Sequence, residues 1–166
     1  MNWDNIVPVL VGGALAVGGG MGTQWLAHHL DKQRKRRAIA GAFAGEIGAI
    51  CSIVDRRKYL EDAQQLLKYM RESKEPHRIL MHITQEYCMI YNTNSGAIGL
   101  LPAPLALGIA TFYTQVKSLM EDVRPETPEV AGIDDAIARL SVQIDLLTET
   151  MRIGKDLVTQ LQKEAK

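Results

Sequence analysis

The sequence has few aromatic residues and only two cysteines among its 166 residues. Aromatic residues make up 5% of the chain, and no stretch shows the period-two alternation of a half-buried strand. The sequence therefore predicts an all-α protein. Cys51 and Cys88 lie in apolar, helix-like stretches, so we expect both to be reduced and buried, with a disulfide or redox pair as the alternative.

Motifs that carry chemistry are also lacking. The sequence contains no phosphate-binding loop, no nucleophile elbow and no zinc motif. His77 and His82 have no cysteine or carboxylate at ligand spacing, and no Glu-x-x-His pair suggests a di-iron bundle. We therefore expect no metal, no cofactor and no enzymatic activity.

Basic residues are concentrated in one short run. Lys and Arg number 19, as do Asp and Glu, so the formal net charge is zero. Once the five basic residues of this run, Asp4 and Asp31 are set aside, 14 basic and 17 acidic residues remain. Because this remainder is mildly acidic, it has no basic face for DNA or RNA, and we expect no nucleic-acid partner.

The N-terminal segment carries no charge from Asn5 to Leu30. The residues from Ile6 to Ala27 are apolar enough and long enough to cross a hydrocarbon core of roughly 30 Å as a helix. Trp3 and Trp25 lie about 33 Å apart along such a helix, one at each interface. Residues 1–30 are therefore predicted to be a transmembrane helix with a short external N-terminus.

The basic run follows the apolar segment as residues 31–37. It comprises Lys32, Arg34, Lys35, Arg36 and Arg37. By the positive-inside rule it places the rest of the chain in the cytoplasm, as expected for a single-pass protein of the inner membrane. The run would act as an interfacial anchor or, alternatively, recruit anionic lipids. A cleaved signal peptide is a further alternative, but its positive charge should precede the apolar core, where only Asp4 is found.

Small residues recur on one face of the predicted span. Ala14, Gly18 and Gly22 are spaced four residues apart, which allows another helix to approach closely. This face predicts self-association or contact with another membrane protein. The alternative is a span that is merely rich in small residues.

Residues 38–166 are predicted to form a cytoplasmic antiparallel bundle of about four helices. Helices are expected from 38 to about 73, from 77 to 92 and from 104 to 122. A final helix is expected to begin with Thr127 as its N-cap and Pro128 in its first turn, and to run to near the C-terminus. Each helix has one apolar stripe, and short connections favour a bundle in which these stripes face one another.

Two features of this bundle leave alternatives open. Residues 38–54 contain a single charged residue, Glu46, and would either pack tightly below the membrane or enter it as a second short span. Glu46 would then be an exposed or capped carboxylate, or a buried functional one. The loop residues Ile98, Leu100 and Leu101 would form either a buried connection or an exposed apolar ridge for a partner.

One part of the bundle resembles known sequences. The stretch NTNSGAIGLLP and the apolar helix after it, with EIGAICSIVDRRKYL near residue 50, are similar to uncharacterised small bacterial proteins. Those proteins have one N-terminal span and a helical cytoplasmic domain. The resemblance implies a bacterial origin and no particular activity.

These observations favour a membrane-anchored interaction or scaffold subunit that self-associates or docks a partner at the cytoplasmic face. The alternative is an oligomeric membrane-active protein, such as a pore, a channel or transporter subunit, or a phage-defence effector. The second class depends mainly on the glycine-rich span and on insertion of residues 38–54.

Overall fold

The computed structural model describes residues 3–81, 87–126 and 132–166, with side chains from Gln24 onward. All regular elements in these ranges are helical, which confirms the all-α prediction for the described residues. They are α1 (Trp3–Arg56), α2 (Tyr59–Ser73), α3 (Met89–Asn94), the 3-10 helix η1 (Ser95–Leu100), α4 (Ala103–Asp122) and α5 (Ile133–Glu164).

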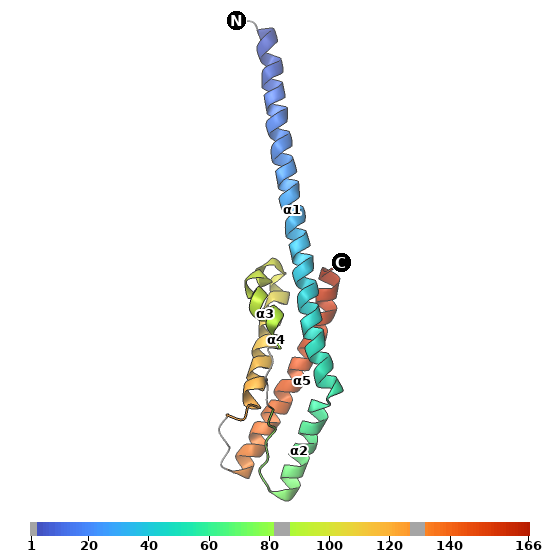
Figure 1. Cartoon of the computed structure of the whole chain (residues 1–166), viewed down its shortest axis with the longest axis vertical. Coiled ribbons are helices and arrows are strands. Elements are labelled where there is room, and N and C mark those ends of the chain that lie inside the picture. Colours follow the sequence, from blue (N-terminus) through green and yellow to red (C-terminus); the bar gives the residue numbers. More distant parts are fainter. Residues whose placement is uncertain (1–2, 82–86, 127–131) are drawn as a thin grey trace.

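Helix α1 is 54 residues long and continues without a break through the basic run. Its C-terminal part lies in the bundle, and the remainder extends away from it (Figure 1). By length and composition α1 can cross a membrane. Among the residues with described side chains, the part that meets this criterion is Gln24–Arg56, and 33% of its apolar window is buried inside the bundle.

Helix α5 is the centre of the bundle. It packs against α1, α2 and α4, and runs in the direction opposite to theirs (Figure 1). Its apolar seam faces inward as predicted, with Leu140, Ile144, Met151 and Leu161 all buried. The predicted start of this helix at Thr127 lies outside the described residues, which place Gly132 at its N-cap.

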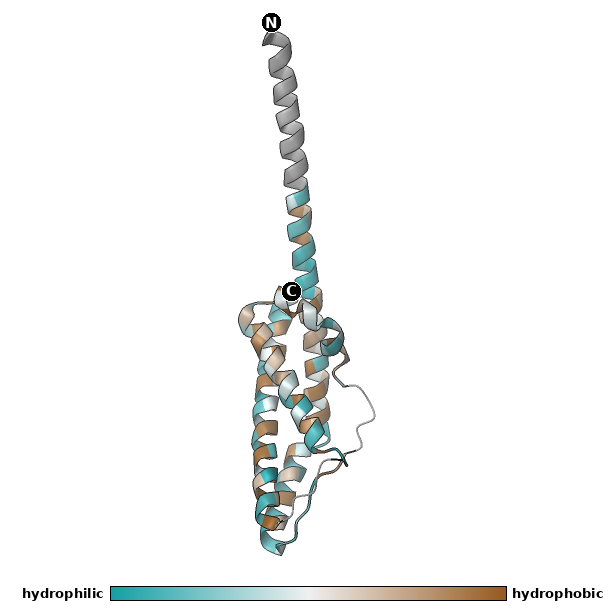
Figure 2. Ribbon diagram, turned by 90° about the vertical axis from the view of Figure 1, so that its left-hand side faces the viewer, coloured by the Kyte–Doolittle hydropathy of each residue, from teal (hydrophilic) through white to brown (hydrophobic). Residues whose placement is uncertain are grey.

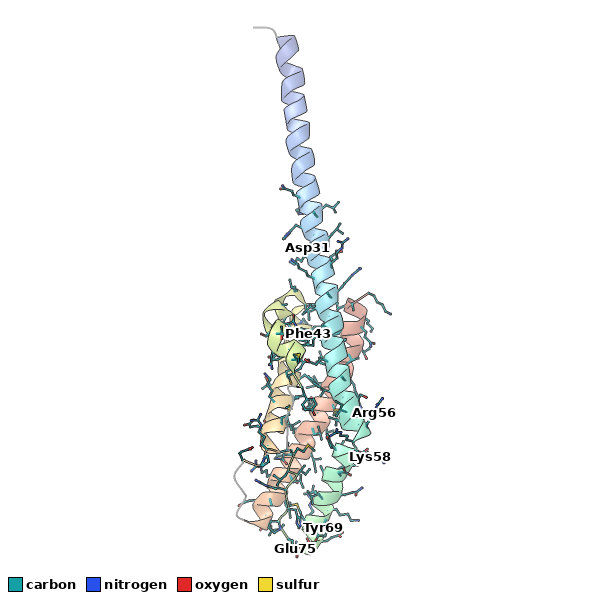
Figure 3. All side chains as sticks on the ribbon, viewed as in Figure 1. Asp31, Phe43, Arg56, Lys58, Tyr69 and Glu75 are labelled. Carbon is teal, nitrogen blue, oxygen red and sulfur yellow. The ribbon has the colours of Figure 1, made fainter. Side chains whose placement is uncertain are left out.

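The predicted helix from 38 to about 73 is interrupted, so this boundary was wrong. Lys58 adopts a left-handed conformation (φ 54°, ψ 33°) between α1 and α2 (Figure 3). No proline or glycine marks the break in the sequence. The change in direction allows Ala63 and Met70 of α2 to become buried against α5, and tertiary packing of this kind overrides helix propensity.

The predicted helix from 77 to 92 was also wrong over much of its length. The chain is not helical from 74 to 81, and α3 begins only at Met89. Instead, the Met81 backbone N–H donates to the Val123 carbonyl at the end of α4, 2.8 Å away. Ile79 packs against α2 and α5 although it is not in a helix. The apolar residue that suggested a helix here is therefore explained by its burial in the core.

The predicted helix from 104 to 122 is confirmed as α4, which begins one residue earlier. Its stripe Leu105, Ile109, Phe112 and Val116 is buried as expected. Pro102 forms its N-cap, and Pro104 lies in the first turn, where a missing backbone donor has little cost.

The core consists of two clusters. The first, which we call the proximal half, joins α1, α3, α4 and the end of α5, and includes Phe43, Ile47 and Tyr113. The second, the distal half, joins α2 to the beginning of α5 through Met70 and Leu140. Figure 2 shows that α1 is mostly hydrophilic between its grey segment and the bundle, so this stretch separates the bundle from the apolar N-terminal segment.

Candidate functional site

The carboxylate of Glu46 binds the beginning of α3. Oε1 accepts a hydrogen bond from the Ile90 backbone N–H at 2.7 Å, and Oε2 accepts one from the Tyr91 N–H at 3.1 Å. The first-turn N–H groups of a helix have no partner within the helix. Cys88, the N-cap residue of α3, provides no side-chain cap, so Glu46 provides it from α1.

Tyr113 completes this arrangement from α4. Its hydroxyl donates to Glu46 Oε2 at 2.5 Å, and its ring is fully buried. The pKa of Tyr113 is raised far above its usual range; burial is the largest cause, and the hydrogen bond to Glu46 is the second. The hydroxyl therefore stays protonated, and continues to donate, well above neutral pH.

Tyr91 and Lys117 add further contacts to this arrangement. The Tyr91 ring stacks on Tyr113 with centroids 4.2 Å apart, and Lys117 Nζ lies 5.0 Å from the Tyr91 centroid. Lys117 also donates to Asn92 Oδ1 at 2.8 Å. We call Glu46, Tyr91, Tyr113 and Lys117 the Glu46 cluster; it links α1, α3 and α4.

The Glu46 cluster is built to hold helices together. Its carboxylate already accepts three hydrogen bonds, one of them from a phenol that does not ionise near neutral pH. The structure shows Glu46 as a half-buried carboxylate that caps α3. Tyr87 is exposed and is not among the hydrogen-bond partners of Glu46 in the described chain.

Both cysteines are free and buried, as expected. Burial raises the pKa of each thiol, and for Cys88 the charge of Glu46 adds to this effect. Both thiols are therefore poor nucleophiles. Among the described residues, no three His, Cys, Asp or Glu side chains gather in a way that could hold a metal ion.

The predicted partner loop forms η1 and the residue after it. Leu101 is buried in the proximal half, whereas Ile98 and Leu100 are half-buried, and Ile98 packs against that core. Only part of the predicted ridge is therefore accessible to another molecule.

The predicted interfacial anchors that can be located lie on α1 between the apolar N-terminal segment and the point where α1 meets the end of α5. Trp25 is 69% exposed and stacks on His29, and Lys32, Arg34 and Arg37 are exposed. Two of the basic residues form ion pairs: Lys35 with Asp31 at 2.7 Å, and Arg36 with Glu164 near the end of α5. Asp31 lies above the bundle in Figure 3.

The remaining predicted site residues are Trp3 and the small-residue face, Ala14, Gly18 and Gly22. They lie on the part of α1 for which the structure describes the backbone and not the side chains.

A large, mostly apolar pocket that is partly open to solvent lies between the two halves of the core. Its volume is about 580 Å³, within the range typical of small-molecule sites. Its lining comes from α1, α2, α4, α5 and the chain before α3, and includes Val54, Leu66, Val116, Leu147 and Met151. We call it the distal cavity.

Polar groups are few in the distal cavity. Thr150 is buried, and its hydroxyl lies 2.6 Å from the Leu146 carbonyl and 3.0 Å from Gln115 Oε1. At the junction of α1 and α2, Arg57 Nη1 donates to the Tyr59 hydroxyl at 2.9 Å. Arg57 is the single cation and Asp62 the single anion among the described lining residues.

The sequence contained little signal for either feature. The hydrogen bonds of Glu46 join residues 44 to 67 positions apart, and the distal cavity is lined mostly by apolar residues with the spacing of ordinary core positions. A lone carboxylate in an apolar stripe was the only hint, and it pointed to no partner.

Comparison of the chain with protein-family models, with curated proteins and with solved structures finds no match.

Proposed function

We propose that the chain is a single-span membrane protein whose cytoplasmic helical bundle self-associates or docks a partner, and that it acts by positioning rather than by catalysis. One observation carries this proposal: α1 is a single helix from the apolar N-terminal segment, through the basic run, into the bundle core.

The structure supports the assignment of the span to the N-terminal apolar segment over residues 38–54. Phe43 and Ile47 are fully buried against the other helices, and Glu46 is bonded to α3. Insertion of this stretch into lipid would expose the carboxylate and break these contacts at a cost of several kcal/mol. The alternative of a membrane-active oligomer depends partly on insertion of residues 38–54, and these contacts argue against that insertion.

A continuous helix also supports a positioning role. At 1.5 Å per residue, α1 is about 80 Å long, with no break between the proposed span and the bundle. Pairing of the spans would therefore bring two bundles into a defined relation. Under this proposal the bundle is antiparallel, with α5 opposed to the other three long helices.

Extraction and topology measurements test the anchor. We expect the full chain to stay with membranes after high-salt and carbonate washes, and a reporter fused to Lys166 to be active only in the cytoplasm. A chain released by carbonate, or an external reporter, would overturn the proposal.

Crosslinking in native membranes tests association through the span. We expect Gly18→Leu and Gly22→Leu each to lower the crosslinked dimer several-fold, because a larger side chain separates the two backbones. Val9→Leu is the control, since position 9 is two and a half helical turns from Gly18 and on the opposite face. Equal dimer yields in all variants would exclude self-association through the small-residue face of the span.

A further inference from the structure

The distal cavity interrupts the hydrophobic core. Protein interiors are close-packed, and even a gap of about 150 Å³ lined by apolar groups stays dry and takes up an apolar molecule. At about 580 Å³ the distal cavity is several times larger, and it is partly open to solvent where such a gap is closed. It lies between Val116 and Met151 of the proximal core and Ala63 and Leu140 of the distal one, so an occupant would complete the core.

The lining selects a long apolar ligand. On α4 it runs from Phe112 to Val123 and on α5 from Leu140 to Met151, which is about 16 Å along each helix. The buried hydroxyl of Thr150 is already satisfied within the protein. The interior therefore offers little to a ligand with polar groups along its length.

One cation, Arg57, and one anion, Asp62, belong to the described lining at the junction of α1 and α2. Arg57 is exposed, as are its neighbours Arg56 and Lys58, which are not part of the lining (Figure 3). Of the nearby acids, Asp55 is paired with Lys155 at 3.0 Å, and Glu61 and Asp62 lie in the first turn of α2, where the helix dipole favours a carboxylate. A guanidinium is well suited to bind a carboxylate head group.

We propose that the distal cavity binds a long-chain fatty acid, with the hydrocarbon chain between α4 and α5 and the carboxylate at Arg57. Arg57 lies 20 residues beyond Arg37, about 30 Å along α1. If the span is where the proposed function places it, a lipid still seated in the bilayer cannot reach this site. The ligand is then the free acid, taken up from the cytoplasmic side.

Photolabelling of the full chain in native membranes tests this. The probe is a fatty acid with a diazirine near the end of its chain, and the adducts are mapped by mass spectrometry of peptides. We expect adducts on the cavity-lining parts of α4 and α5, suppressed by excess oleate. Adducts confined to residues 6–27 would mean that the probe is merely dissolved in the bilayer and would overturn the proposal.

Matched variants of α5 sharpen the test. Leu147→Trp fills the cavity, so the α4 and α5 adducts should fall about tenfold. Val142→Trp introduces the same side chain on the same helix, at a position that is 66% exposed and outside the lining, and should leave labelling unchanged. Circular dichroism melting checks that both variants fold. Unchanged labelling in a folded Leu147→Trp protein would also overturn the proposal.

The head group is tested separately. Arg57→Gln should weaken competition by oleate about tenfold and leave competition by the corresponding long-chain alcohol unchanged, since only the acid carries charge. Equal effects on acid and alcohol would remove Arg57 from the site. If carbonate released the protein and α4 and α5 were still labelled, fatty-acid binding would be supported and the membrane anchor would be excluded. If the protein stayed in the membrane and α4 and α5 were not labelled, the anchor would be supported and fatty-acid binding would be excluded.

Discussion

The two halves of the bundle bury their apolar residues in different ways. Among the described residues, the proximal half contains sixteen buried ones, including Phe43, Ile47 and Phe112 with no exposed surface, and it is fastened by the Glu46 cluster. The distal half contains five buried residues of the described chain, and α2 is held there mainly by α5. The distal cavity lies between them. The half next to the basic run is thus closely packed, and the far half has room for another molecule.

Truncation of a core side chain should separate the two halves most clearly. Phe43→Ala should lower the free energy of unfolding by about 3–5 kcal/mol, because the cavity it creates is enclosed by α3, α4 and α5. Leu66→Ala, at a half-buried site beside an existing cavity, should cost about 1 kcal/mol. Urea unfolding of the full chain in mild detergent, followed by circular dichroism, measures both. Equal losses would show that the halves are packed alike.

Removal of the Glu46 carboxylate should have the next largest effect. Glu46→Ala leaves two backbone N–H groups and the Tyr113 hydroxyl without an acceptor, which should cost about 3 kcal/mol. Glu46→Gln keeps one acceptor oxygen and should cost roughly half as much. Hydrogen exchange of the Ile90 and Tyr91 amides should accelerate in Glu46→Ala. Unchanged exchange at these two amides would show that Glu46 does not cap α3.

A methyl group added to α5 tests how closely it approaches α1 and α4. A Cβ at position 154 would lie 2.6 Å from both Cys51 Sγ and Phe112 Cε2, so Gly154→Ala should destabilise the protein by about 2 kcal/mol. Gly45→Ala is the control: no atom lies within 4 Å of its Cβ, and alanine should stabilise α1 by roughly 0.5–1 kcal/mol. In the same urea titration, the free energy of unfolding should fall for Gly154→Ala and rise for Gly45→Ala. A stabilising Gly154→Ala would contradict the close approach of α5 to α1 and α4.

The smallest expected effect is a pH dependence from Tyr113. The pKa of Tyr113 is raised in the folded chain and has its ordinary value near 10 in the unfolded one. Above pH 10 the unfolded state therefore binds fewer protons, and stability falls as pH rises. Between pH 9 and 11 the wild-type protein should lose about 1.4 kcal/mol more than Tyr113→Phe. Parallel pH profiles for the two proteins would mean that Tyr113 titrates normally when folded.

The helices that could be predicted were those with long, regular apolar stripes. Leu105, Ile109, Phe112 and Val116 identified α4, and the seam ending at Leu161 identified α5. The errors occurred where spacing alone was ambiguous. Ile79 and Ile90 are both inward-facing, yet only Ile90 is in a helix, because the chain near Met81 bonds to the end of α4 instead of to itself.

The sequence by itself determined the helical class, the apolar N-terminal segment with its basic boundary, and the inward faces of α4 and α5. These follow from local properties: the period of apolar residues and the position of charges along the chain. Only the tertiary structure decided that Lys58 divides one long helix into two, that Glu46 caps a helix 44 residues away, and that a cavity separates the two cores. Each of these depends on contacts between residues far apart in the chain, and such contacts have no local pattern.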